Sequence, residues 1–141
     1  MNTLDTWRLL NRTHAAMRDA IEHELVEHHH LALVTFAALD AIASTADGRL
    51  GMAALADAVG VTRSGCTRLV ERAEGDGLIA RKRVHHRHVD ATLTSAGRAA
   101  LRAARPTYAA AHAAALDAQR SQLAQLGRQL AAPRTRPRTT P

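Results

Sequence analysis

Residues 55–69 read LADAVGVTRSGCTRL, a spacing typical of two short helices joined by a tight turn. Ala56 is a small residue where two helices must approach closely, and Gly60 supplies the positive φ that a sharp turn requires. Thr62 can cap the second helix through its side-chain oxygen. The apolar residues whose spacing buries the inner faces of both helices are Leu55, Val59, Val61, Cys66 and Leu69. This stretch therefore predicts a helix-turn-helix.

The second of these helices carries a polar and basic outer face. The side chains that point away from the predicted core are Arg63, Ser64, Thr67, Arg68 and Arg72. Guanidinium and hydroxyl groups of this kind donate hydrogen bonds to phosphates and to base edges. At this point an ordinary αα-hairpin with a solvated, arginine-rich face is the alternative.

A basic β-hairpin follows this helix. Residues 75–77 (GDG) end the helix, and residues 78–82 and 89–93 predict two strands. The segment between them, residues 83–88, is polar and basic. A helix-turn-helix followed directly by a basic hairpin predicts a winged helix, and the combination is far more specific than either part alone.

Helical patterns flank the winged helix on both sides. They predict helices at about residues 3–28, 31–44, 95–115 and 116–132. Pro106 should kink the third of these, because proline lacks an amide donor. The first and last helices carry apolar stripes, formed by Trp7, Leu10, His14, Met17, Ile21, Leu25 and His28, and by Leu116, Leu123, Leu126 and Leu130. Since these stripes lie outside the winged helix, we expect a homodimer interface; a monomer in which the end helices cover one another is the alternative.

The sequence thus predicts a mainly α (α+β) fold in three parts. Residues 1–30 and 95–132 form a helical dimerisation region, and residues 31–94 form a winged helix-turn-helix with a two-stranded β-wing. Residues 133–141 are a basic, proline-rich tail that we expect to be disordered. Aromatic residues make up only 2% of the chain, which favours closely packed helices over a sandwich of sheets.

Charge is distributed unevenly along the chain. Residues 1–60 carry a net charge of −4, residues 61–90 carry +3 and residues 91–132 carry +4, within a total of +6. The predicted recognition helix and wing are therefore positive, as a face that binds DNA phosphates requires. No apolar run approaches the ~20 residues that span a bilayer, and no signal-like segment is present. We expect a cytoplasmic, nucleoid-associated protein with no membrane partner.

Nine histidines and one cysteine raise the question of metal or catalytic chemistry. The run His28, His29 and His30 lies at a helix end, where consecutive side chains point in different directions and do not form a tetrahedral ligand set. Cys66 falls on the buried side of the recognition helix, where its oxidation would push the motif apart. No nucleophile motif or glycine-rich phosphate loop is present. We expect no enzyme activity, no cofactor and no bound metal; a metal- or redox-responsive regulator is an alternative.

The order of elements resembles the multiple-antibiotic-resistance regulator (MarR) family across residues 4–132. The matching stretches are VTRS at residues 61–64, TRLVER at 67–72, GLI at 77–79 and LTSAG at 93–97. The resemblance implies a homodimeric transcriptional repressor that binds a pseudo-palindromic operator in double-stranded DNA and is released by a small-molecule effector. A winged-helix protein-interaction dimer that has lost operator binding is the alternative.

The resemblance also implies roles for individual residues. Those that it assigns to the major groove are Thr62, Arg63, Ser64, Thr67 and Arg68. Arg72 would face a phosphate from the same helix. Arg81 would brace the base of the wing.

At the tip of the wing, the resemblance implies that Arg83, His86 and Arg87 contact DNA. Arg87 matches the family's arginine that enters the minor groove. His85 stands where the family usually has an aspartate that orients this arginine. We therefore expect a weaker or more mobile wing, whose charge varies with pH.

The family's ligand pocket lies between the dimerisation helices and the winged domain. Candidate lining residues here are Trp7, His14, Met17, His28, Phe36, Tyr108 and His112. Each is equally consistent with packing in the core or at an interface, so the sequence does not indicate the chemistry of the effector.

Overall fold

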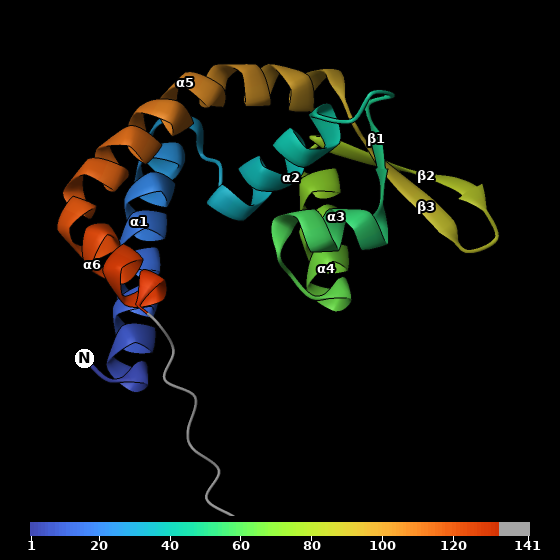
Figure 1. Ribbon diagram of the computed structural model, residues 1–141. Helices are drawn as coiled ribbons and strands as arrows, with labels where there is room; N and C mark the ends of the chain where they lie inside the picture. The colour runs from blue at the N-terminus through green and yellow to red at the C-terminus, as the bar shows by residue number, and fades with distance from the viewer. Residues whose placement is uncertain (133–141) are drawn as a thin grey trace, which may run out of the picture.

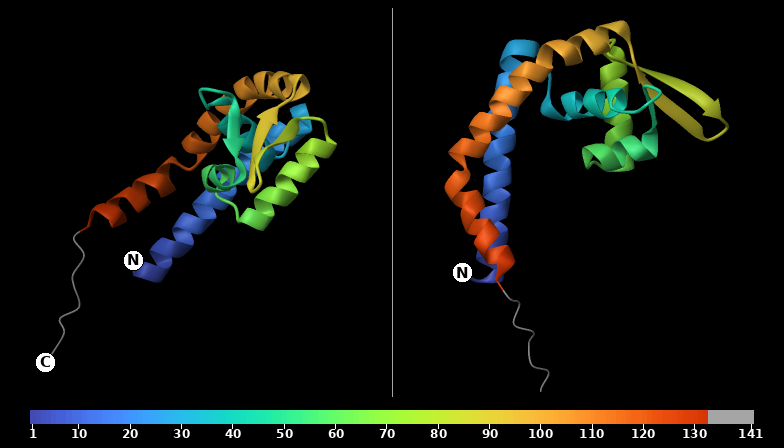
Figure 2. Two further views of the ribbon diagram at one scale, coloured as in Figure 1. Left: turned by 90° about the vertical axis from the view of Figure 1, so that its right-hand side faces the viewer. Right: turned by 45° about the horizontal axis from the view of Figure 1, so that its top comes forward.

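The computed structural model describes residues 1–132, which form a helical arm and a separate lobe (Figure 1). The elements in chain order are α1 (Thr3–His29), α2 (Leu33–Ala43), β1 (Arg49–Gly51), α3 (Met52–Val59), α4 (Arg63–Gly75), β2 (Ile79–His85), β3 (His88–Leu93), α5 (Ser95–Ala118) and α6 (Arg120–Ala131). The lobe holds α2, α3, α4 and the sheet, whereas α1 and α6 lie in the arm. The helix α5 runs from the lobe into the arm and joins the two (Figure 2). The mainly α winged-helix fold expected from the sequence is confirmed.

Local capping explains where several helices begin and end. The Asn2 side chain accepts a hydrogen bond from the Asp5 amide at the start of α1. This helix ends at His30, a non-glycine residue in the left-handed region (φ 52°), whose amide bonds to the carbonyl oxygens of Leu25 and Val26. At the start of α5, the Thr94 hydroxyl accepts from the Gly97 amide at 2.9 Å. Hydroxyl and amide side chains at these positions satisfy amides that have no partner within the helix.

The sheet contains one more strand than the two-stranded wing predicts. Its order is β1-β3-β2, with both pairs antiparallel. Strand β1 is only three residues long and pairs Leu50 with Ala91 of β3. Three residues are too few to show the alternation of apolar and polar side chains by which a strand is predicted. Its partner strand also lies about forty residues further along the chain.

The boundary between the last two helices differs from the predicted one. We expected a break between residues 115 and 116, but α5 continues to Ala118 and the break falls at Gln119. Alanine has the highest helix propensity, so the alanine-rich segment around residues 109–118 continues the helix past residue 115. Pro106 lies inside α5, which curves between the lobe and the arm (Figure 1), in agreement with the expected kink.

The helices of the arm pack on one another within a single chain. Helix α1 contacts both α5 and α6, and its buried residues are Leu9, Thr13, Ile21 and Leu25. The expectation that the end helices have little to cover them within one subunit is therefore wrong for this inner face. It holds for the opposite face, where Trp7 is 58% exposed and Leu10 is 45% exposed.

Within residues 1–132, no helix is both long enough and apolar enough to cross a membrane. The predicted disordered tail, residues 133–141, lies outside the described residues.

Candidate nucleic-acid interface

The turn between α3 and α4 sets the position of the recognition helix. Gly60 adopts φ 77°, a left-handed conformation that glycine tolerates without strain. Its amide and that of Val61 both donate to the Ala56 carbonyl, at 2.9 and 3.0 Å. Thr62 then caps α4, because its hydroxyl oxygen accepts from the Gly65 amide at 3.0 Å. The left-handed conformation of Gly60 and the Thr62 cap were both predicted from residues 55–69.

The inner face of α4 is buried against the lobe. Its buried residues are Cys66, Leu69, Val70 and Ala73. The Cys66 sulfur lies 3.6 Å from the Met52 carbonyl oxygen, and burial raises the pKa of its thiol. A buried thiol with a raised pKa is a poor nucleophile, so the geometry favours the packing role of Cys66 over a redox-sensing one.

The outer face of α4 is exposed along its whole length. The exposed residues are Arg63, Ser64, Thr67, Arg68, Glu71 and Arg72. Two hydroxyls are held locally, since Thr67 donates to the Arg63 carbonyl at 3.1 Å and Ser64 lies 3.3 Å from the Thr62 hydroxyl. Glu71, which was not anticipated from the sequence as part of this face, adds one negative charge to an otherwise basic surface.

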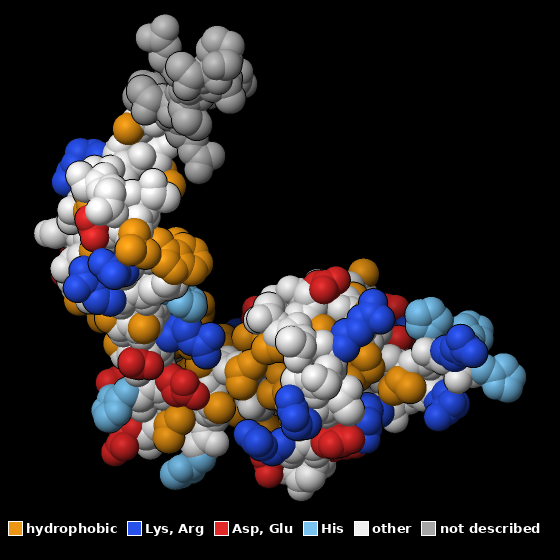
Figure 3. All heavy atoms as spheres, turned by 90° about the horizontal axis from the view of Figure 1, so that it is seen from below, with side chains coloured by type: hydrophobic (Ala, Val, Ile, Leu, Met, Phe, Trp, Pro, Cys, Tyr) orange, Lys and Arg blue, Asp and Glu red, His pale blue; other side chains and the backbone are white. Residues whose placement is uncertain are grey.

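The wing extends away from the lobe beside this helix (Figure 1). Strands β2 and β3 pair from Ile79 and Leu93 at the base to His85 and His88 at the end. A two-residue turn, His86–Arg87, connects them. Every residue from 81 to 88 is exposed. Figure 3 shows lysine and arginine side chains over the lobe, with histidines gathered at the far end of the wing.

Arg81 links the base of the wing to α4. The Arg81 Nε atom donates to Glu74 Oε1 at 3.1 Å, and Nη2 lies 2.9 Å from the same oxygen. The Arg81 backbone amide donates to Glu74 Oε2 at 3.4 Å. These hydrogen bonds lower the pKa of Glu74 and raise the pKa of Arg81. The geometry fits the bracing role expected of Arg81, and its partner Glu74 was not anticipated from the sequence.

We expect Glu74→Gln to loosen the wing. In the wild type the pKa of Glu74 is lower in the folded protein than in the unfolded chain. The contribution of this pair to stability is therefore present above the unfolded-state pKa and is lost as pH falls through the folded-state pKa. Denaturant unfolding from neutral to acid pH should show a shallower loss of stability in the variant, and amide exchange in β2 should be faster.

The matched control for this prediction is Glu71→Gln, which removes one charge from α4 without breaking the hydrogen bonds of Glu74. If both variants give the same pH profile and the same exchange in β2, Glu74 does not brace the wing.

The predicted ligand-pocket residues fall into separate groups. Phe36 stacks on Tyr108 with ring centroids 4.6 Å apart, and Tyr108 stacks on His112 at 5.8 Å. Trp7 and His14 are exposed on the N-terminal half of α1, and the partly buried Met17 packs against the core. Neither Trp7 nor His14 belongs to the aromatic stack.

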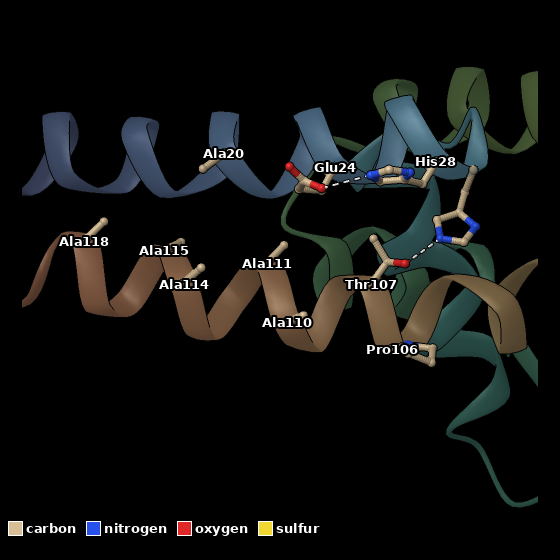
Figure 4. A pocket seen from close by; sticks show the side chains of 11 residues that line it. Ala20, Glu24, His28, Pro106, Thr107, Ala110, Ala111, Ala114, Ala115 and Ala118 are labelled. Atoms are coloured by element: carbon tan, nitrogen blue, oxygen red, sulfur yellow. Dashed lines mark hydrogen bonds and ion pairs between the residues drawn. The ribbon is translucent and has the colours of Figure 1, made fainter.

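His28 lines a different hollow, a groove of about 850 Å³ between α1 and α5 (Figure 4). At one end, His28 pairs with Glu24 at 3.2 Å and His29 contacts the Thr107 hydroxyl at 2.7 Å. The rest of the lining is mainly small and apolar: Ala20, Pro106, Ala110, Ala111, Ala114, Ala115 and Ala118. The sequence did not predict this groove, because alanine side chains have no functional group that would indicate a binding site.

Metal ligands are not clustered in the described part of the chain. Within residues 1–132, no three His, Cys, Asp or Glu side chains lie close enough to hold a metal ion.

Comparison with known proteins agrees with this geometry. The family of winged helix-turn-helix DNA-binding domains matches residues 36–80. No similar sequence is found among curated proteins. The fold of residues 36–80 is therefore that of the winged helix-turn-helix DNA-binding domains.

Solved structures with a similar fold belong to one family of transcriptional regulators. Sco3205, a MarR family regulator from Streptomyces coelicolor solved in complex with DNA, is 24% identical, with a TM-score of 0.77 over 93% of this chain and 91% of that one. MosR of M. tuberculosis, also solved with DNA, is 26% identical, with a TM-score of 0.68 over 92% and 96%. Rv2887 of Mycobacterium tuberculosis, solved with salicylic acid, is 27% identical, with a TM-score of 0.62 over 86% and 93%. The chain has the architecture of MarR-family DNA-binding transcriptional regulators, and the resemblance noted in the sequence is confirmed.

Proposed function

We propose that this protein is a sequence-specific repressor that binds a pseudo-palindromic operator as a homodimer. The observation that carries the proposal is the fully exposed outer face of α4, set beside a basic wing on a lobe that stands apart from the arm (Figure 3). A helix of this kind fits the major groove, where Arg68 would read base edges and Arg72 would bind phosphate. Two DNA-bound relatives of the same fold support this reading.

Selection from a pool of random duplexes tests the proposal, because it finds the preferred operator sequence directly. The expected result is enrichment of an inverted repeat whose half-sites lie about 10 bp, or a multiple of this, apart. Enrichment of no sequence at all would remove the proposal, and enrichment of a single, non-repeated site would remove its dimeric part.

The apolar residues exposed on the arm support the homodimer. The large hydrophobic side chains of the arm that are exposed by 40% or more are Met1, Leu4, Trp7, Leu10, Val26, Leu116 and Leu130. Such a concentration on one part of a protein marks an interaction site. We propose that a second copy of the chain covers these residues, so that residues 1–30 and 95–132 form the dimerisation region and residues 31–94 the DNA-binding domain.

Trp7 makes the dimer directly measurable, since it is the only tryptophan of the chain. On dilution its fluorescence should shift from the emission of a buried indole to that of an exposed one, in parallel with the mass from sedimentation. The double variant Leu10→Glu/Leu130→Glu should weaken association by more than about tenfold, because each leucine contributes roughly 1.5–3 kcal/mol when buried.

Val84→Glu is the matched control for the dimer, because Val84 is an exposed apolar residue on the wing, 42% accessible and far from the arm. This variant should keep the dimer. A wild-type mass of one chain at micromolar concentration would contradict the homodimer.

A small-molecule effector is the remaining part of the proposal. The relative solved with salicylic acid supports an effector of the aromatic-acid class. Two places on this chain are candidates: the stack of Phe36, Tyr108 and His112, and the groove that contains His28 (Figure 4). Tyr108→Ala and His28→Ala distinguish them, since only the variant at the true site should retain DNA binding while losing its response to salicylate.

A further inference from the structure

The end of the wing carries an unusual concentration of imidazole groups. We define the wing tip as Arg83, His85, His86, Arg87 and His88, all of which are exposed. The His85 and His88 rings lie across the strands from one another, with centroids 6.3 Å apart and planes tilted by 59°. Arg83 donates through Nη1 to the His86 carbonyl at 3.2 Å and thereby ties the turn to β2. The turn and the two strand ends beside it therefore place three histidines and Arg87 at the far end of the wing.

No carboxylate belongs to this cluster. The nearest acidic residue along the strands is Asp90, which pairs across the sheet with Lys82 and lies 3.7 Å from the Arg49 Nε atom of β1. On α4, Glu74 is held by Arg81 at the base of the wing, and Glu71 also acts on Arg81. Asp90 and Glu74 are thus paired with basic groups below the tip.

A DNA phosphate placed at the tip favours the protonated form of these imidazoles, because an opposite charge within a few ångström stabilises a positive side chain. Histidine is the side chain for which such a change falls near neutral pH.

We propose that the wing tip is a proton-linked DNA contact, in which His85, His86 and His88 bind the duplex backbone as imidazolium groups. The inference rests on the proposed function and adds two contact residues, His85 and His88, together with a condition for tight binding. The consequence is that DNA binding takes up protons, so affinity rises as pH falls.

The test measures affinity for the selected operator, and for a random duplex of equal length, between about pH 8 and about pH 5.5 at several salt concentrations. Wild-type affinity should rise on the order of 10- to 100-fold toward acid pH, and the salt slope should steepen by about 0.9 for each imidazolium–phosphate contact. Calorimetry in two buffers of different ionisation enthalpy should show net proton uptake on binding.

Three variants separate the wing tip from other sources of pH dependence. His85→Gln/His86→Gln/His88→Gln should bind at the alkaline wild-type level at every pH. His85→Lys/His86→Lys/His88→Lys should bind tightly at every pH. His23→Gln, which removes an exposed histidine from α1, should keep the wild-type profile.

The outcomes distinguish the inference from the proposed function. If the wild type binds the operator but its pH profile matches that of the triple glutamine variant, the proton-linked wing is wrong and the repressor stands. If the wild type binds neither duplex at any pH, the proposed function itself is wrong.

Discussion

Gly97→Ala should destabilise the protein by about 3–5 kcal/mol, the largest effect that we expect from a single methyl group. A Cβ atom at Gly97 would lie 2.0 Å from the Leu78 carbonyl oxygen and 3.0 Å from its carbonyl carbon. Both atoms belong to the backbone, so no side-chain rotation relieves the clash. The same carbonyl accepts from the Thr94 amide at 3.1 Å, and the Thr94 hydroxyl donates to the Gly77 carbonyl at 2.5 Å. The start of α5 and the base of the wing must therefore separate.

Thermal or denaturant unfolding followed by circular dichroism measures this effect, and Gly127→Ala is the control. Gly127 lies exposed within α6, and a Cβ atom there would meet nothing within 4 Å. Alanine should be neutral or stabilise the helix by up to about 1 kcal/mol at such a position. If the two variants are equally stable, the close approach of α5 to Leu78 is wrong.

Arg68→Ala should weaken operator binding by about 1–3 kcal/mol, or roughly 5- to 150-fold in Kd, and should relax the preference for one base pair in each half-site. Arg68 is exposed in the middle of α4, one turn after Ser64 and one turn before Arg72. A guanidinium at this place in the major groove can donate two hydrogen bonds to a guanine, which no other base accepts in the same geometry. Binding to random duplex should fall far less.

Arg18→Ala and Arg87→Ala complete this experiment. Arg18 is exposed on α1 in the arm, so its removal should leave operator affinity unchanged although the loss of charge is the same. Arg87→Ala should weaken binding to all duplexes and flatten the salt dependence, because a wing arginine acts mainly through the DNA backbone. An Arg68→Ala variant that keeps both operator affinity and sequence preference would exclude α4 as the recognition helix.

The sequence is most informative where local chemistry determines the backbone. The helix-turn-helix could be predicted because Gly60 needs its left-handed conformation and Thr62 caps the following helix within four residues of chain. Strand β1 could not be predicted in the same way, since its pairing with β3 is formed only in the folded protein. The brace between Glu74 and Arg81 likewise joins a helix to a strand across a turn.

The ligand site shows a different limit of sequence reasoning. The predicted pocket residues are mostly aromatic residues and histidines, and three of them, Phe36, Tyr108 and His112, do stack on one another. The groove that contains His28 is open because the alanines of α5 that line it have small side chains (Figure 4). Small residues on a helix are equally compatible with close packing and with a groove, and only the position of α1 decides between them.

Protection of guanine N7 atoms from methylation on the selected operator tests the central claim most directly. The two recognition helices of a dimer should protect two major-groove segments on one face of the duplex, centred about 10 bp or a multiple of this apart. Arg68→Ala should remove the protection at one guanine in each segment. Absence of major-groove protection, or protected segments that fall on opposite faces of the duplex, would contradict the account.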